Sequence, residues 1–124
     1  MGYKLRTSKK TEEILCEIET SENLPWPTLM KLAISLSIKQ GSLMEIELFT
    51  DSQGRELNRQ TVTGEFDTMY KCLIELTEGQ HLTDDEFFPQ YIKGHLDRGA
   101  VLLEREHKYS KDFIIHLSNL DAAI

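Results

Sequence analysis

Two hydrophobic runs of this chain are joined by the polar stretch Asp51-Ser-Gln-Gly-Arg-Glu-Leu-Asn-Arg-Gln-Thr-Val-Thr-Gly-Glu-Phe-Asp-Thr-Met-Tyr70. Asp51, Ser52 and Gly54 are typical of a turn, and Gly64 indicates a second one. The short segment between the turns is polar and includes Arg55, Asn58 and Arg59. Polar residues this dense between hydrophobic runs usually form a surface that meets a partner.

An amphipathic helix is predicted after the turn at Gly64, over Glu65 to Thr77, with Gly79 ending it. We expect its buried side to consist of Phe66, Met69, Tyr70, Leu73, Ile74 and Leu76.

Another helix is predicted after Thr83, because Thr83 and Glu86 have the spacing of a capping box. Pro89 is expected to mark its effective start, since a proline inside a helix costs about 3 kcal/mol. Gly94 and Gly99 indicate either close helix packing or a break. A short last helix is predicted over about Lys111 to Leu120.

The N-terminal part alternates over residues 3–7, which predicts a short strand with Lys4 and Arg6 on one face. Ser8 or Thr11 is suited to cap a first helix, which ends near Ser21. A second helix is predicted from about Pro27 to Gly41. Leu43 to Thr50 alternates as well and predicts a second strand.

The strand and two helices of residues 3–40 have the pattern of a ribbon-helix-helix unit. In such a unit the strands of two chains pair, and the ribbon enters the major groove of DNA. Lys4 and Arg6 would then face DNA, while Tyr3 and Leu5 would face the dimer core. The start of the second helix, near Trp26 to Thr28, could hold a phosphate with its free N–H groups. A lone short strand needs a partner, so this interpretation predicts a dimer.

The length and composition are those of a single domain, residues 1–124. The predicted helices place this domain in the mainly α class, with a ribbon-helix-helix-like N-terminal half. The formal net charge of −7 argues against a surface that attracts phosphate everywhere. Residues 1–10 nevertheless hold four cations and no acid, so they form either a basic binding end or a solvated, frayed terminus. No long apolar run and no signal-peptide pattern occur in the sequence, and we therefore expect a cytoplasmic protein.

The sequence gives little support for catalysis. Cys16 and Cys72 lack neighbours that would favour a thiolate, which disfavours a reactive role for either thiol, and the four histidines show no metal-ligand spacing. Asp84, Asp85 and Glu86 are explained as first-turn charges of a helix. We expect no cofactor, no metal and no enzymatic activity; a nickase is the third-ranked alternative.

The order of residues resembles the DndE family of DNA sulfur-modification (phosphorothioation) proteins. Three stretches carry the likeness: the opening strand with Ser8-Lys-Lys-Thr11; Asp51 to Arg59 continuing through Thr63-Gly-Glu-Phe-Asp67; and Leu96-Asp-Arg-Gly-Ala-Val-Leu-Leu103. The middle stretch is the most specific, because no common local structure requires Asn58-Arg59 ahead of Thr63-Gly64-Glu65.

The resemblance implies a small, mostly helical homo-oligomer, a dimer or a tetramer. It implies a non-catalytic subunit that works with a sulfur-transfer enzyme and an ATPase and binds nicked double-stranded DNA through lysines. The candidate DNA-binding residues here are Lys4, Arg6, Lys9, Lys10, Arg55 and Arg59. The acidity of the chain departs from that expectation. A stand-alone ribbon-helix-helix transcriptional regulator is the alternative function.

Overall fold

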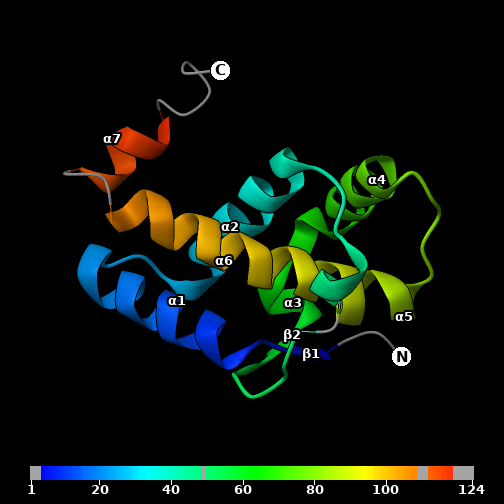
Figure 1. The fold of residues 1–124 in the computed structure, drawn as a ribbon, viewed down its shortest axis with the longest axis horizontal. Helices are drawn as coiled ribbons and strands as arrows, with labels where there is room; N and C mark the ends of the chain where they lie inside the picture. Colours follow the sequence, from blue (N-terminus) through cyan, green and yellow to red (C-terminus); the bar gives the residue numbers. More distant parts are fainter. Residues whose placement is uncertain (1–3, 49, 109–111, 119–124) are drawn as a thin grey trace.

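The computed structural model describes residues 4–48, 50–108 and 112–118, and within them the protein is mainly α, as predicted. Helix α6 (Lys93–Lys108) runs through the middle of the molecule and packs against α2 (Trp26–Gln40) and α1 (Lys9–Glu22) (Figure 1). Ser8 caps α1 by accepting a hydrogen bond from the backbone N–H of Thr11, which confirms one of the two predicted caps. No helix among the described residues is both long and apolar enough to cross a lipid bilayer.

The predicted N-terminal strand exists as β1 (Lys4–Arg6), but its partner lies in the same chain. It pairs antiparallel with β2 (Glu56–Asn58), with Leu5 opposite Leu57. The reason given for a dimer, a strand without a partner, is therefore wrong. Leu5 is buried in the core of its own chain, and Tyr3 lies outside the described residues.

Leu43 to Thr50 does not form the predicted strand. Glu45–Leu48 make a 3-10 turn, η1, and Phe49 is not described. Within the described part of the chain no strand lies beside this segment, so an extended conformation would leave its backbone groups unpaired. Met44 and Ile46 are exposed instead of facing a core.

Two short helical turns, α3 (Arg59–Val62) and η2 (Gly64–Phe66), lead from β2 into α4 (Asp67–Glu78). The predicted buried side of α4 is only partly right, because Tyr70 and Ile74 are buried whereas Phe66, Met69, Leu73 and Leu76 are exposed. The exposed four recur at intervals of three and four residues, which places them along one outward side of the helix.

The capping box at Thr83 is confirmed and starts α5 (Asp84–Glu86). Pro89 does not start a helix. It lies inside η3 (Phe87–Ile92), a π-helical turn that continues directly into α6. A widened turn of this kind accommodates a residue without an N–H group, which explains why the helix survives the proline. The predicted last helix is α7 (Phe113–Ser118); residues 111, 119 and 120 lie outside the described residues.

Gly99 lets α6 approach the backbone of α2 closely. A methyl group there would overlap the backbone carbonyl of Ala33 on α2, which supports the close-packing interpretation of the helical glycines. The largest fully buried side chains surround this crossing and extend to α4 and η3: Leu15, Ile18, Leu29, Met30, Ile34, Ile74, Leu82, Phe87, Phe88, Ile92, Leu96 and Leu103.

Candidate nucleic-acid interface

Five of the six predicted DNA-binding residues lie on one connected part of the surface, which we call the basic rim: Lys4, Arg6, Lys9, Lys10 and Arg55. All five are exposed. Lys4 and Arg6 flank the buried Leu5 on β1. Lys9 and Lys10 form the first turn of α1, and Arg55 immediately precedes β2.

The two halves of the basic rim, far apart in sequence, are joined at Thr7. Its backbone N–H donates to the carbonyl of Arg55 at 3.0 Å, and its hydroxyl accepts from the N–H of Arg55 at 3.0 Å. Its carbonyl accepts from the N–H of Gly54 at 2.9 Å. A Cβ atom at Gly54 would overlap the Thr7 hydroxyl, so this close approach requires a glycine.

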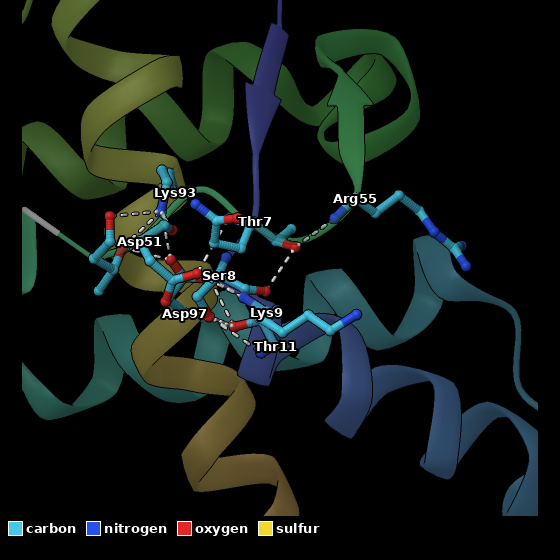
Figure 2. A network of polar contacts seen from close by, with 10 residues as sticks. Thr7, Ser8, Lys9, Thr11, Asp51, Arg55, Lys93 and Asp97 are labelled. Atoms are coloured by element: carbon cyan, nitrogen blue, oxygen red, sulfur yellow. Dashed lines mark hydrogen bonds and ion pairs between the residues drawn. The ribbon is translucent and has the colours of Figure 1, made fainter.

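A buried carboxylate, Asp97, fixes the start of α1 to the middle of α6. One of its oxygens accepts from the Ser8 N–H at 3.2 Å and the Thr11 hydroxyl at 2.6 Å. The other accepts from the Thr50 hydroxyl at 2.6 Å and the Lys93 ammonium at 2.8 Å. We call these five residues the Asp97 clamp. It joins three segments of the chain, namely the start of α1, the segment that holds Thr50, and α6. Figure 2 shows Ser8, Thr11, Lys93 and Asp97 gathered there, with Asp51 beside them.

Asp51 occupies the amino end of α1. Its carboxylate accepts from the backbone N–H of Lys9 at 2.9 Å and of Gln53 at 3.1 Å. The hydrogen bond from Lys9, and then that from Gln53, lower the pKa of Asp51 below its ordinary value. The end of this helix is therefore already satisfied by a carboxylate, which leaves the side chains of the rim, and not the helix N–H groups, to meet an anion.

The cations of the basic rim are only lightly paired. Lys9 lies 3.3 Å and Arg55 4.0 Å from the carboxylate of Glu12, which stands between them. Lys4 lies 4.0 Å from Glu56. Exposed pairs of this kind contribute about 0–1 kcal/mol, so they leave the cations able to bind another anion. The side chains of Lys9 and Arg55 extend toward the same side in Figure 2.

Arg55 also brings a cation to the start of α2. Its guanidinium lies 3.8 Å from the ring centroid of Trp26, the first residue of that helix. The predicted phosphate position at the start of α2 is thus adjacent to the basic rim.

Arg59, the sixth predicted residue, points into the protein. Its guanidinium donates to both oxygens of Asp67, at 2.8 and 2.6 Å, and lies 3.3 Å from Asp84. It also lies 5.1 Å from the ring centroid of Phe87, and its side chain is only 15% exposed. Although burial opposes ionisation, the bonds from Arg59 and Thr63 lower the pKa of Asp67. Arg59 therefore holds η2 and α4 in place.

Lys93 and Asp97 were missed by the sequence reasoning. Their spacing of four residues on a helix is a usable signal for an ion pair, but nothing local shows that it is buried or that it binds Ser8 and Thr50. In the described ranges, no three His, Cys, Asp or Glu residues gather in a way that could hold a metal ion.

A cavity of about 490 Å³ lies next to the Asp97 clamp. One wall is a stripe of α6 that includes Val101, Leu102 and Arg105. Lys10 of α1 and Glu47 of η1 line other sides.

The chain is similar to proteins of DNA sulfur modification. The family described as "DNA sulphur modification protein DndE" matches residues 4–111. No curated protein matches the chain. A solved structure, DndE from Escherichia coli B7A involved in DNA phosphorothioation modification, matches with a TM-score of 0.67 and 16% identity. The match covers 82% of this chain and 95% of that one, and at this identity it shows the fold alone. The family match extends over most of the sequence, including the basic rim and the Asp97 clamp, and the chain therefore belongs to the DndE family.

Proposed function

We propose that this chain is a non-catalytic accessory subunit of a DNA phosphorothioation system, and that it binds double-stranded DNA, nicked duplex included, through the basic rim. The observation that carries the proposal is the rigid placement of exposed cations. Lys9 and Lys10 begin a helix whose start is fixed by the Asp97 clamp, and Arg55 is fixed beside them through Thr7. Because the backbone beneath these cations is already ordered, only their side chains lose conformational freedom when they meet phosphates.

The binding we propose is weak and salt-sensitive. The rim has few cations on a chain of net charge −7, and Glu12 and Glu56 lie among them. Contacts to phosphate position a protein on DNA but do not read its sequence. We expect little preference among sequences.

The test is a low-salt gel shift with nicked duplex. Reversing the charge of Lys9 and Lys10 to Glu is expected to weaken binding strongly. Lys108→Glu is the control, because Lys108 is the last residue of α6, about 16 Å along the helix from Asp97. Figure 1 shows that this end of α6 lies away from β1. Unchanged binding by the Lys9/Lys10 variant would refute the site.

The alternative is a ribbon-helix-helix transcriptional regulator, which needs β1 to pair with a second chain. Here β1 pairs with β2 of its own chain, and this favours the accessory subunit. A competition gel shift with random duplex separates the two functions, since a regulator resists competition at its operator. A nickase would relax supercoiled plasmid in the presence of magnesium, and we expect no relaxation.

Self-association is part of the proposal, and we assign it to the outward side of α4. Phe66, Met69, Leu73 and Leu76 are 40–79% exposed, which is unusual for large apolar residues that lie together along one side of a helix. The carboxylates of α4 are used within the chain; for example, Glu75 accepts from the N–H of Leu82 at 2.8 Å. A second copy of this chain can therefore pack there without burying like charges.

Cys72, which is exposed on the same helix, gives the test. In a Cys16→Ser background, a two-fold α4–α4 contact brings the two Cys72 thiols near the axis, so a short bismaleimide is expected to link two chains. Leu73→Glu should abolish both the linkage and the dimer in sedimentation. A monomer in the unchanged protein at high concentration would contradict the assignment. The sulfur-transfer and ATPase subunits of the system are the further partners we propose, in the cytoplasm.

A further inference from the structure

We propose that the cavity beside the Asp97 clamp binds a nucleoside monophosphate, with the phosphate between Lys10 and Arg105 and the base against Val101 and Leu102. Arg105 was not among the candidates drawn from the sequence. Lys10 and Arg105 approach the cavity from different helices, α1 and α6.

Several charged groups around the cavity are already bound to other groups of the protein. Arg98 donates to the carbonyls of Ser37 and Ser42 and pairs with Glu47 at 3.4 Å. Asp97 has four donors, one of them the Lys93 ammonium. Arg98 and Asp97 therefore have no free capacity for a ligand, and the charge of Glu47 is offset by that of Arg98.

The other charged groups are Asp51, Lys10 and Arg105. Asp51 is bound to two backbone N–H groups. Both Lys10 and Arg105 are exposed, and neither makes an ion pair or a side-chain hydrogen bond with any residue in the described ranges. The charges with no assigned role are thus both positive, and they favour an anionic ligand.

The size and lining of the cavity also suit a nucleoside monophosphate. A volume of about 490 Å³ is within the range of small-molecule sites. Val101 and Leu102 are half-buried and offer an apolar wall, which suits a flat, weakly polar body such as a nucleobase. An apolar wall with two free cations fits a ligand that has a base at one end and a phosphate at the other.

Such a ligand has two sources, a free mononucleotide or the 5′-phosphorylated end of a DNA strand. The interpretation of the ligand as a DNA strand end rests on the proposed function, because Lys10 belongs to both the cavity and the basic rim. The free mononucleotide does not depend on it.

The experiment titrates the full-length protein with deoxyadenosine 5′-monophosphate, with inorganic phosphate and with deoxyadenosine, observed by NMR. We expect the monophosphate to bind more tightly than either fragment. Arg105→Gln should weaken its binding about tenfold, as expected for loss of one charge-assisted contact. Lys108→Gln, on the same helix and outside the cavity, should have no effect. Val101→Trp should fill the cavity and abolish binding while the amide spectrum stays that of a folded protein.

A second arm compares nicked duplexes with and without a 5′-phosphate at the nick. A preference for the phosphorylated nick that Arg105→Gln removes assigns the cavity to a strand end. Equal binding of both duplexes, together with tight binding of the monophosphate, assigns it to a free nucleotide.

The proposal is overturned if the monophosphate does not bind at about 10 mM, or if Arg105→Gln and Val101→Trp bind it as the unchanged protein does. In that case the Lys9/Lys10 gel shift still decides the proposed function independently. Conversely, loss of all DNA binding leaves the mononucleotide titration as a valid test of the cavity.

Discussion

The ammonium of Lys93 lies 2.8 Å from the carboxylate of Asp97, one turn further along α6, and both side chains are more than nine-tenths buried. Lys93 also donates to the Thr50 hydroxyl at 2.6 Å and to the Asp51 carbonyl at 2.8 Å. A buried ion pair is costly to break on one side, because the remaining charge has no solvent to stabilise it.

Asp97→Asn is therefore expected to lower the free energy of unfolding by about 3–5 kcal/mol, measured by urea denaturation. The double variant Lys93→Met/Asp97→Leu removes both charges and should lose less stability than Asp97→Asn alone. If the double variant is the less stable of the two, the pair does not act as a buried ion pair.

His95 is expected to make the free energy of unfolding depend on pH. The ring is fully buried, with Nδ1 2.8 Å from the Ser37 hydroxyl and Nε2 3.2 Å from the Glu78 carboxylate. Burial, assisted by the charge of Arg98, lowers the pKa of His95 from 6.5 to about 4, although the Glu78 carboxylate favours protonation.

The unfolded chain thus takes up a proton at His95 between pH 6.5 and about 4 while the folded chain does not. The stabilisation is complete above pH 6.5 and is lost as the pH falls toward 4, by an amount on the order of 3 kcal/mol. Urea denaturation at pH 7, 5.5 and 4.5 measures it. His95→Gln should flatten this dependence, whereas His81→Gln on the surface should not; equal pH profiles for all three proteins would exclude His95 as the cause.

Gly99→Ala tests the crossing of α2 and α6. Alanine in a helix normally gains about 1 kcal/mol over glycine. Here its methyl group would overlap the backbone of Ala33, so we expect a loss of about 1–3 kcal/mol instead. Thermal denaturation shows the sign, and a melting temperature at or above that of the unchanged protein would mean that the helices are not this close. Ser21→Ala, at an exposed position of α1, is the control and should change stability by no more than about 0.5 kcal/mol.

Substitutions of Arg59 and Arg55 are expected to have different effects, the first on stability and the second on DNA binding. Arg59→Gln removes the two-bond contact with Asp67 and should cost about 1–3 kcal/mol of stability. Arg55→Gln removes an exposed cation and should weaken DNA binding with little change in stability. Urea denaturation and a gel shift on both variants check this assignment; the reverse pattern would place Arg59 in the interface.

Local patterns in the sequence were sufficient for two of the helix starts, although Pro89 did not mark a third. Ser8 and the Thr83–Glu86 box were predictable because a capping side chain reaches only three residues along the chain. Most of the basic rim was predictable because its cations cluster in the sequence.

The tertiary partners were not predictable. β1 pairs with β2, and the paired residues Leu5 and Leu57 are 52 positions apart in the sequence. A strand of three residues carries too little pattern to identify such a partner. The apolar stripe of α4 looks like a core face in sequence, since periodicity does not tell whether another element of the same chain covers it. The inward turn of Arg59 depends on Asp67 and Asp84, which only the folded chain brings together.

The central claim, that Lys9 and Lys10 contact DNA phosphates, is tested most directly by the salt dependence of binding to a nicked duplex. The slope of log K against log salt falls by about 0.9 for each phosphate contact that is lost. We predict that Lys9→Ala/Lys10→Ala reduces the magnitude of the slope by about 2, while Lys108→Ala leaves it unchanged. The same slope for all three proteins would contradict the account.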